Sequence, residues 1–220
     1  MLLKQLTQKV KKAKPISFYK PGRTIRARNT TYKLSKPYGK IRDGRFAPEL
    51  SPPEMLVKGV FEGKYLNNDT AEFPREWFQA ALARKKLSPE KADEQVNMFK
   101  IKSRLPLSQW RLNGWVSSTS VEHPSRHLET RIPSSKKVTR RRQYDMLSSS
   151  KNPDTKGWFQ WYCRYYIGRR LPELDSVQKK RWIAFTRHAG AVRKNCTAGD
   201  LKCRPRQRQA LLQWAYRPTI

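Results

Sequence analysis

A dense aromatic stretch is the clearest element of the chain, GWFQWYCRYYIGRR at residues 157–170. At 100° per residue its six aromatic side chains fall within an arc of about 160°, with Gln160 and Arg164 on the opposite face. Gly168 stands where the residue after a helix C-cap is expected. A strand is the alternative, because alternate residues from Phe159 to Ile167 would then share one face. We expect a helix with a buried aromatic face, rather than a platform on which nucleotide bases stack.

Two more amphipathic helices are predicted after this stretch. In LDSVQKKRWIAFTRHAGAVRKNC, apolar residues such as Trp182 occupy one face and basic residues another, with Asp175 or Ser176 as the expected N-cap. In CRPRQRQALLQWAY, Pro205 lies near the first turn, ahead of an apolar stripe. Helices near 156–171, 176–194 and 205–216 predict a C-terminal trihelical module.

The middle of the chain predicts short helices. FPREWFQAALARKK carries apolar residues at helical spacing after Pro74, which predicts a helix near 74–86. SPEKADEQVNMFK begins with a candidate N-cap, Ser88, and has acidic residues in its first turns, which predicts a second helix near 89–101. LPLSQWRLNGW fits a short strand or a helical turn. The later segment SSKKVTRRRQYDMLSSSKNPD is Ser-rich and basic, and it fits a linker or a loop that faces RNA.

The N-terminal segment predicts a basic arm. Leu2, Leu3, Leu6 and Val10 stand at helical spacing among lysines, and this acid-poor start resembles an organelle transit segment. From Pro15 to Pro53, prolines and glycines interrupt any apolar periodicity, and the aromatic residues are dispersed among cations. We favour an arm that lies on RNA over an uncleaved import signal, with a solvated tail as the plainer alternative. Such an arm would become ordered only on assembly.

These elements predict a mainly α fold in four parts. They are a basic extended arm (1–53), a near-neutral to basic middle region with short helices (54–135), a basic linker (136–155) and a C-terminal helical module (156–220).

Charge narrows the range of partners. The chain of 220 residues holds 48 Lys and Arg against 17 Asp and Glu, a formal net charge of +31. The cations are concentrated at the two ends: residues 1–46 contain fourteen basic residues and one acid, Asp43, whereas residues 47–100 contain eight basic and nine acidic residues. A polyphosphate neutralises many cations at once and releases its condensed counterions. We therefore expect nucleic acid as the partner, and not a membrane, because no stretch of 18 or more apolar residues is present.

The candidate nucleic-acid-binding residues are the cations of the arm, the linker and the C-terminal helices. They are Lys11, Lys12, Lys14, Arg23, Arg26, Arg28, Lys33, Lys136, Lys137, Arg140, Arg141, Arg142, Arg169, Arg170, Lys179, Lys180, Arg187, Lys194, Arg204, Arg206 and Arg208.

Cysteine spacing bears on metals and on the compartment. The three cysteines, Cys163, Cys196 and Cys203, form no CxxC pair, and with His188 they lack the paired spacing of a zinc site. We expect ordinary buried cysteines and no metal, although the residue types leave a site open. An odd number of cysteines predicts an intracellular, reducing compartment, with the mitochondrial matrix or another organelle as an option.

No catalytic motif stands out. The chain has no phosphate-binding GxxxxGK[ST], no HExxH and no GxSxG, and its acidic residues beyond position 100 are scattered. We expect no enzyme, no cofactor and no small-molecule substrate.

Two blocks, DTKGWFQWYCRYYIGRR and CRPRQRQALLQWAY, resemble the hallmark sequences of an uncharacterised protein family. The resemblance covers roughly residues 150–220. It implies a recurring module and carries no established activity.

The sequence therefore predicts a structural RNA-binding component of a large ribonucleoprotein that also contacts neighbouring proteins. A ribosomal protein, with a mitochondrial ribosome as one option, is the first hypothesis. A DNA-compacting or virion-core protein that binds nucleic acid is the alternative.

Overall fold

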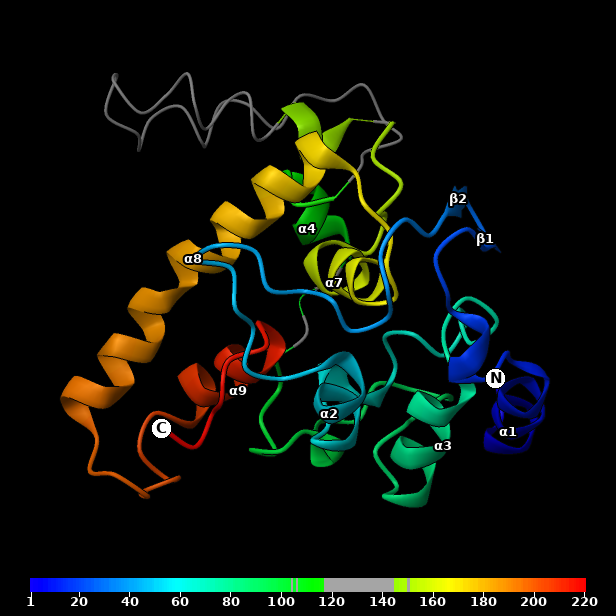
Figure 1. The fold of residues 1–220 in the computed structure, drawn as a ribbon. Coiled ribbons are helices and arrows are strands. Elements are labelled where there is room, and N and C mark those ends of the chain that lie inside the picture. The colour runs from blue at the N-terminus through cyan, green and yellow to red at the C-terminus, as the bar shows by residue number, and fades with distance from the viewer. Residues whose placement is uncertain (104, 106, 117–144, 150) are drawn as a thin grey trace.

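The structure, a computed structural model, describes residues 1–220 apart from 104, 106, 117–144 and 150. The described part is mainly helical, with one small antiparallel sheet (Figure 1). Its helices are α1 (Leu3–Lys12), α2 (Pro52–Val57), α3 (Arg75–Ala83), α4 (Leu107–Leu112), α7 (Trp158–Tyr166), α8 (Pro172–Asn195) and α9 (Pro205–Gln213). The 3₁₀ turns are η1 (Ile16–Phe18), η2 (Phe61–Gly63) and η3 (Glu94–Val96), and the strands are β1 (Thr24–Arg26) and β2 (Thr31–Lys33).

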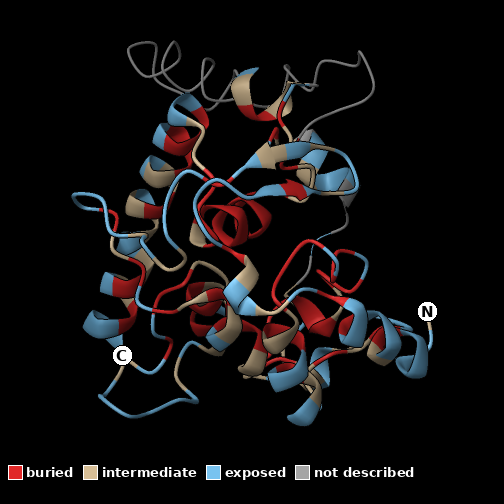
Figure 2. Cartoon of the chain, turned by 45° about the vertical axis from the view of Figure 1, so that its right-hand side comes forward, coloured by how far each residue is buried: buried red, intermediate tan, exposed pale blue. Residues whose placement is uncertain are grey.

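Helix α7 forms the centre of the core. Eight of its nine residues are buried, from Trp158 to Tyr165, which confirms the predicted helix and its buried aromatic face. Figure 2 shows its ribbon in the buried colour at the middle of the molecule. Phe46 packs edge-on against Trp161 and Tyr165, with ring centroids 5.6 and 5.7 Å apart. The aromatic arc is therefore a core surface that other segments cover.

The N-terminal segment is one of those segments. The amides of Ser35 and Lys36 donate to the carbonyl of Gly168, and the amide of Gly39 donates to that of Tyr166. Gly168 has a φ of +112°, and a Cβ there would lie 2.1 Å from the carbonyl oxygen of Lys36. Only glycine allows the chain to cross the end of α7 at this distance.

The expectation of an extended arm outside the core is wrong. Apolar side chains of residues 1–50 join the same hydrophobic cluster as α7, among them Leu6, Val10, Tyr19, Ile25 and Leu34. Burial of these side chains against distant parts of the chain opposes the entropy cost of ordering the segment. Contacts also cross the expected domain boundary at residue 53, since the Tyr162 hydroxyl donates to the carbonyl of Leu50.

The middle region matches the prediction in part. Helix α3 confirms the helix expected near 74–86, and α4 resolves the alternatives for LPLSQWRLNGW in favour of a helix. The helix expected near 89–101 is wrong. The Ser88 hydroxyl donates to the carbonyl of Lys91, and Asp93 caps only the 3₁₀ turn η3 by accepting from the amide of Gln95.

The C-terminal helices occur where the sequence predicts them, but α8 begins earlier than expected. Its N-cap is Leu171, whose amide donates to the Asp175 carboxylate, so Asp175 lies inside the helix and not at its start. Helices α8 and α9 are joined through Trp182, whose indole N–H donates to the carbonyl of Trp214. Within the described ranges, no helix has both the length and the apolar character needed to cross a membrane.

Candidate nucleic-acid interface

Helix α1 separates apolar and basic faces. Leu6 and Val10 are buried, whereas Lys4, Lys9, Lys11 and Lys12 are exposed. At 100° per residue, Lys4, Lys11 and Lys12 lie on the side opposite the buried pair, and Lys9 lies at its flank. The lysines of the last turn also suit the negative end of the helix dipole. The helix therefore presents a row of cations to solvent.

The hairpin of β1 and β2 also has an exposed face and a buried face, because successive residues of a strand point to opposite sides. Thr24 pairs with Lys33 and Arg26 with Thr31, and all four residues are exposed, while Ile25 between them is buried. Arg23, Arg28 and Lys14 near the hairpin are exposed as well. Arg26 and Lys33 thus lie on one outer face.

Lys9, Arg26 and Arg28 line one cleft between α1 and the hairpin. The cleft also reaches Asp69 and Glu72, but these carboxylates are buried and paired with Lys156 and Arg164. The cations at its mouth form none of the ion pairs seen among the described residues. We name these exposed cations of α1, the hairpin and the cleft between them the α1–hairpin surface.

Helix α8 carries a second basic surface. Lys180, Arg187 and Lys194 are exposed and recur every seven residues, which places them about 10.5 Å apart along one stripe of the helix. The intervening positions on this stripe include the small residues Ala184 and Gly190. No acidic residue occurs between 176 and 199. We name this stripe the α8 surface.

Arg204 and Arg206, predicted from the crowded start of α9, are both exposed. Arg204 is the N-cap of α9, with a left-handed backbone (φ 52°), and its side chain donates to Gln207. Both guanidiniums remain accessible to an anion.

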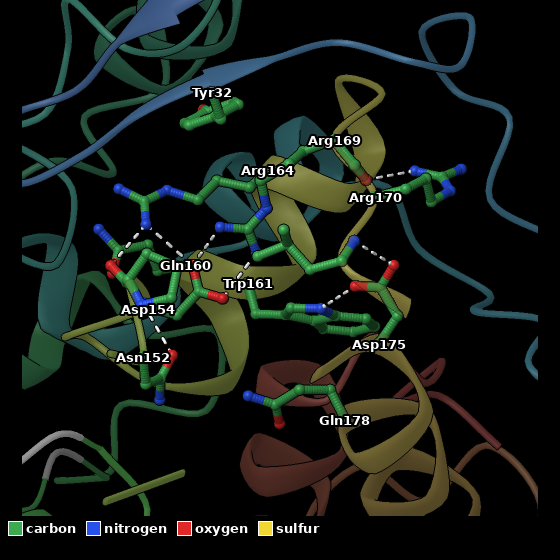
Figure 3. A network of polar contacts seen from close by, with 12 residues as sticks. Tyr32, Asn152, Asp154, Gln160, Trp161, Arg164, Arg169, Arg170, Asp175 and Gln178 are labelled. Carbon is green, nitrogen blue, oxygen red and sulfur yellow. Dashed lines mark hydrogen bonds and ion pairs between the residues drawn. The ribbon is translucent and has the colours of Figure 1, made fainter. Parts of the chain in front are cut away.

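Arg169 is not a surface cation, which corrects the prediction. It is 1% exposed, and its Nη1 and Nη2 donate to the two Asp154 oxygens at 2.8 and 2.6 Å. Arg164 shares Asp154 and also pairs with Glu72. The Tyr32 ring lies 5.6 Å from Arg164 and 5.5 Å from Arg169 (Figure 3). Two buried cations are thus balanced by two buried carboxylates, and the guanidiniums serve the core.

Arg208 is a second correction. It is fully buried, and its guanidinium donates to the backbone carbonyls of Asp200, Cys203, Pro218 and Ile220. Through these hydrogen bonds, Arg208 connects the loop before α9 to the segment after α9. All four hydrogen bonds of the guanidinium end on carbonyl groups within the protein.

Arg170 and Lys179 are only partly available. Arg170 lies over the Tyr165 ring, 3.6 Å from its centroid, and donates to the carbonyls of Tyr165, Arg169 and Lys40. Lys179 pairs with Asp43, and this hydrogen bond lowers the pKa of the Asp43 carboxyl. Both side chains hold the N-terminal segment to the C-terminal helices. Lys136, Lys137, Arg140, Arg141 and Arg142 lie outside the described residues.

The cysteines differ from the expectation. Cys196 and Cys203 form a disulfide that closes the loop between α8 and α9, with their Cα atoms 5.8 Å apart. Cys163 is a free thiol buried in the core, and burial raises its pKa well above the usual range. The expectation of ordinary buried cysteines is wrong for Cys196 and Cys203, and their disulfide does not support the reducing compartment inferred from the cysteine count. Within the described part of the chain, no three potential metal-ligating side chains gather.

Some surface cations were missed at the sequence level. Lys4 and Lys9 belong to the α1–hairpin surface, and Arg193 is exposed near the end of α8. The helical angle of Lys4, opposite Leu6 and Val10, was a signal that could have identified it.

Comparisons of the chain with protein-family models, with curated proteins and with solved structures gave no match.

Proposed function

We propose that the protein is a structural RNA-binding component of a large ribonucleoprotein, with a ribosome, mitochondrial or other, as the assembly. One observation carries the proposal. Among the described residues, burial takes five carboxylates but only three guanidiniums out of solvent: Glu62, Asp69, Glu72, Asp154 and Asp175 against Arg164, Arg169 and Arg208. The exposed surface is thus even more basic than the formal charge of +31 suggests.

The mechanism is electrostatic. Exposed cations of the α1–hairpin and α8 surfaces neutralise phosphates and release counterions, a contribution that does not depend on base sequence. The folded helical core holds these cations at fixed positions, so that RNA shape rather than base identity selects the site. The buried side chains Arg164, Arg169 and Arg208 keep the core in register and take no part in binding. We propose no catalytic group, cofactor or metal for this chain.

A DNA-compacting or virion-core role is the second candidate. It is favoured by the positions of α1 and α8, which lie on opposite sides of the molecule in both views (Figures 1 and 2). Two basic surfaces that face apart could bind two nucleic-acid segments at once.

Sedimentation distinguishes these assemblies. The tagged protein is expressed in the cells that produce it naturally, and a lysate is run on a sucrose gradient. The protein should co-sediment with one ribosomal subunit, and ribonuclease treatment should shift it to the top of the gradient. Release by deoxyribonuclease and not by ribonuclease would favour the second candidate. Sedimentation as a free protein without either treatment would contradict both.

A further inference from the structure

An aromatic cleft lies where α4, α7, α8 and α9 meet. It encloses about 120 Å³ and is lined mainly by Phe61, Trp110, Trp115, Trp158, Trp214 and Arg181. An engineered cavity of about 150 Å³ takes up one benzene ring. At about 120 Å³ the cleft is smaller than that cavity, so it can take in only part of a planar ring, with the rest lying across its open mouth.

Tryptophan is concentrated at this cleft. Four of the seven tryptophans of the chain line it. Trp158 and Trp214 pack with their ring centroids 4.8 Å apart and form part of the wall. Trp115 is 39% exposed, in contrast to Trp161 and Trp77, which are buried. An exposed indole beside a wall of indoles offers a surface for stacking with a planar ring.

The indole N–H groups divide into two sets. Those of Trp77, Trp158, Trp161 and Trp182 donate to acceptors within the protein. Those of Trp110, Trp115 and Trp214 have no hydrogen-bond acceptor in the described ranges, and all three line the cleft. These three N–H groups form no hydrogen bond to a described residue and remain available as donors.

Arg181 adds a positive charge at the same place. Its Nη1 donates to the side-chain oxygen of Gln178 at 2.8 Å, and its guanidinium lies 5.4 Å from the Trp214 ring centroid. It takes part in none of the ion pairs of the described residues. Burial lowers the pKa of Arg181 to about 10, so the side chain remains charged at neutral pH. A cation held without a carboxylate attracts an anionic group.

The walls of the cleft are fixed by hydrogen bonds. Ser103, at the rim, donates its amide to Glu62 and accepts at its hydroxyl from Gln213 of α9. On the floor, Gly157 has a φ of +79°, and a Cβ there would lie 3.2 Å from Val116 and 3.5 Å from the Trp110 ring. Trp110 therefore rests directly on the backbone at the start of α7.

We propose that this cleft binds one unpaired nucleobase of a single-stranded segment, stacked on Trp115, with its phosphate drawn to Arg181. A nucleotide combines what the site offers: a planar ring for the tryptophans, ring acceptors for the free N–H groups and a phosphate for the guanidinium. The inference rests on the proposed function and deepens it, because it adds a preference for unpaired bases to binding that is otherwise carried by phosphates. The base-stacking platform is thus assigned to the edge of the aromatic core and not to the buried face of α7.

Abasic oligonucleotides measure the contribution of phosphates to binding without that of the bases. Binding of a fluorescent eight-nucleotide single strand is compared with that of an abasic strand of equal length and charge, at one salt concentration. Stacking of one base should make the intact strand bind about tenfold more tightly. This comparison uses the unaltered protein and depends on no variant.

Variants then locate the effect. Trp115→Ala should abolish the preference for the intact strand, and Trp115→Phe should retain most of it, because the ring is conserved. Arg187→Gln on the α8 surface is the matched control and should weaken both strands equally. Thermal melts confirm that each variant is folded.

The outcomes distinguish this inference from the proposed function. Equal affinity for the intact and abasic strands would overturn the base-binding cleft and leave phosphate binding intact. A preference that survives in Trp115→Ala would also overturn it. Failure of either strand, and of duplex RNA, to bind at low salt would overturn the proposed function and the cleft with it.

Discussion

At the scale of single residues, arginine has two distinct roles in this chain. Arg164 and Arg169 share Asp154 in the core, whereas Arg187 and Arg206 face solvent. The sequence does not separate the roles because the partners are remote: Glu72 lies 92 positions before Arg164. The fold alone reveals which guanidiniums are neutralised.

The shared carboxylate yields a stability prediction. Asp154→Asn leaves Arg169 without its carboxylate in a site that water does not reach, and should lower the free energy of unfolding by about 3–5 kcal/mol. Asp43→Asn is the matched control, since Asp43 forms an exposed pair with Lys179 and should cost at most about 1 kcal/mol. Urea unfolding followed by tryptophan fluorescence measures both. Equal effects would show that the buried cluster contributes nothing specific.

At the scale of elements, the helices that depend on local apolar spacing could be predicted from the sequence. Helices α7, α8 and α9 follow from apolar spacing, since their buried stripes can be counted along the chain. The N-terminal segment was misjudged because Pro and Gly hide its contribution to the core, which depends on contacts with α7 more than a hundred positions away. The aromatic cleft was missed for the same reason, since Trp110, Trp158 and Trp214 come from separate parts of the sequence.

The α8 surface gives a prediction of its own. Replacing Lys180, Arg187 and Lys194 together by glutamine should flatten the slope of log K against log salt by about two units, because each phosphate contact contributes about 0.7–0.9. The melting temperature should hardly change, since all three side chains are exposed. Fluorescence anisotropy with structured RNA from 50 to 300 mM salt measures the slope.

A control with the same charge change tests whether position matters. Arg84, Lys85 and Lys91 are exposed in the near-neutral middle region, and their triple glutamine variant removes three charges away from α8. Its slope should stay close to that of the unaltered protein. If both variants flatten the slope alike, net charge alone governs binding and the α8 surface has no special role.

At the scale of the whole molecule, the aromatic core separates two basic surfaces. Helix α1 and the hairpin lie on one side of α7, and α8 lies on the other (Figure 1). The buried ion cluster of Arg164, Arg169, Glu72 and Asp154 connects the hairpin, the middle region and α7. The indole N–H of Trp161 in α7 donates to Asp175 of α8, so both surfaces are attached to α7. The proposed function therefore predicts that one molecule binds two nucleic-acid segments, one on each surface.

Bridging is the consequence that can be measured. When the protein is added to a mixture of donor-labelled and acceptor-labelled RNA duplexes, energy transfer should rise at substoichiometric protein and fall again in excess, as each duplex acquires its own protein. The α8 triple glutamine variant should still bind duplex through α1 and the hairpin but should lose most of the transfer, and a Lys4, Lys11 and Lys12 triple glutamine variant should behave in the same way. The Arg84, Lys85 and Lys91 variant should bridge normally. Transfer that persists in both surface variants would mean that aggregation of neutralised complexes, and not two defined surfaces, brings the duplexes together.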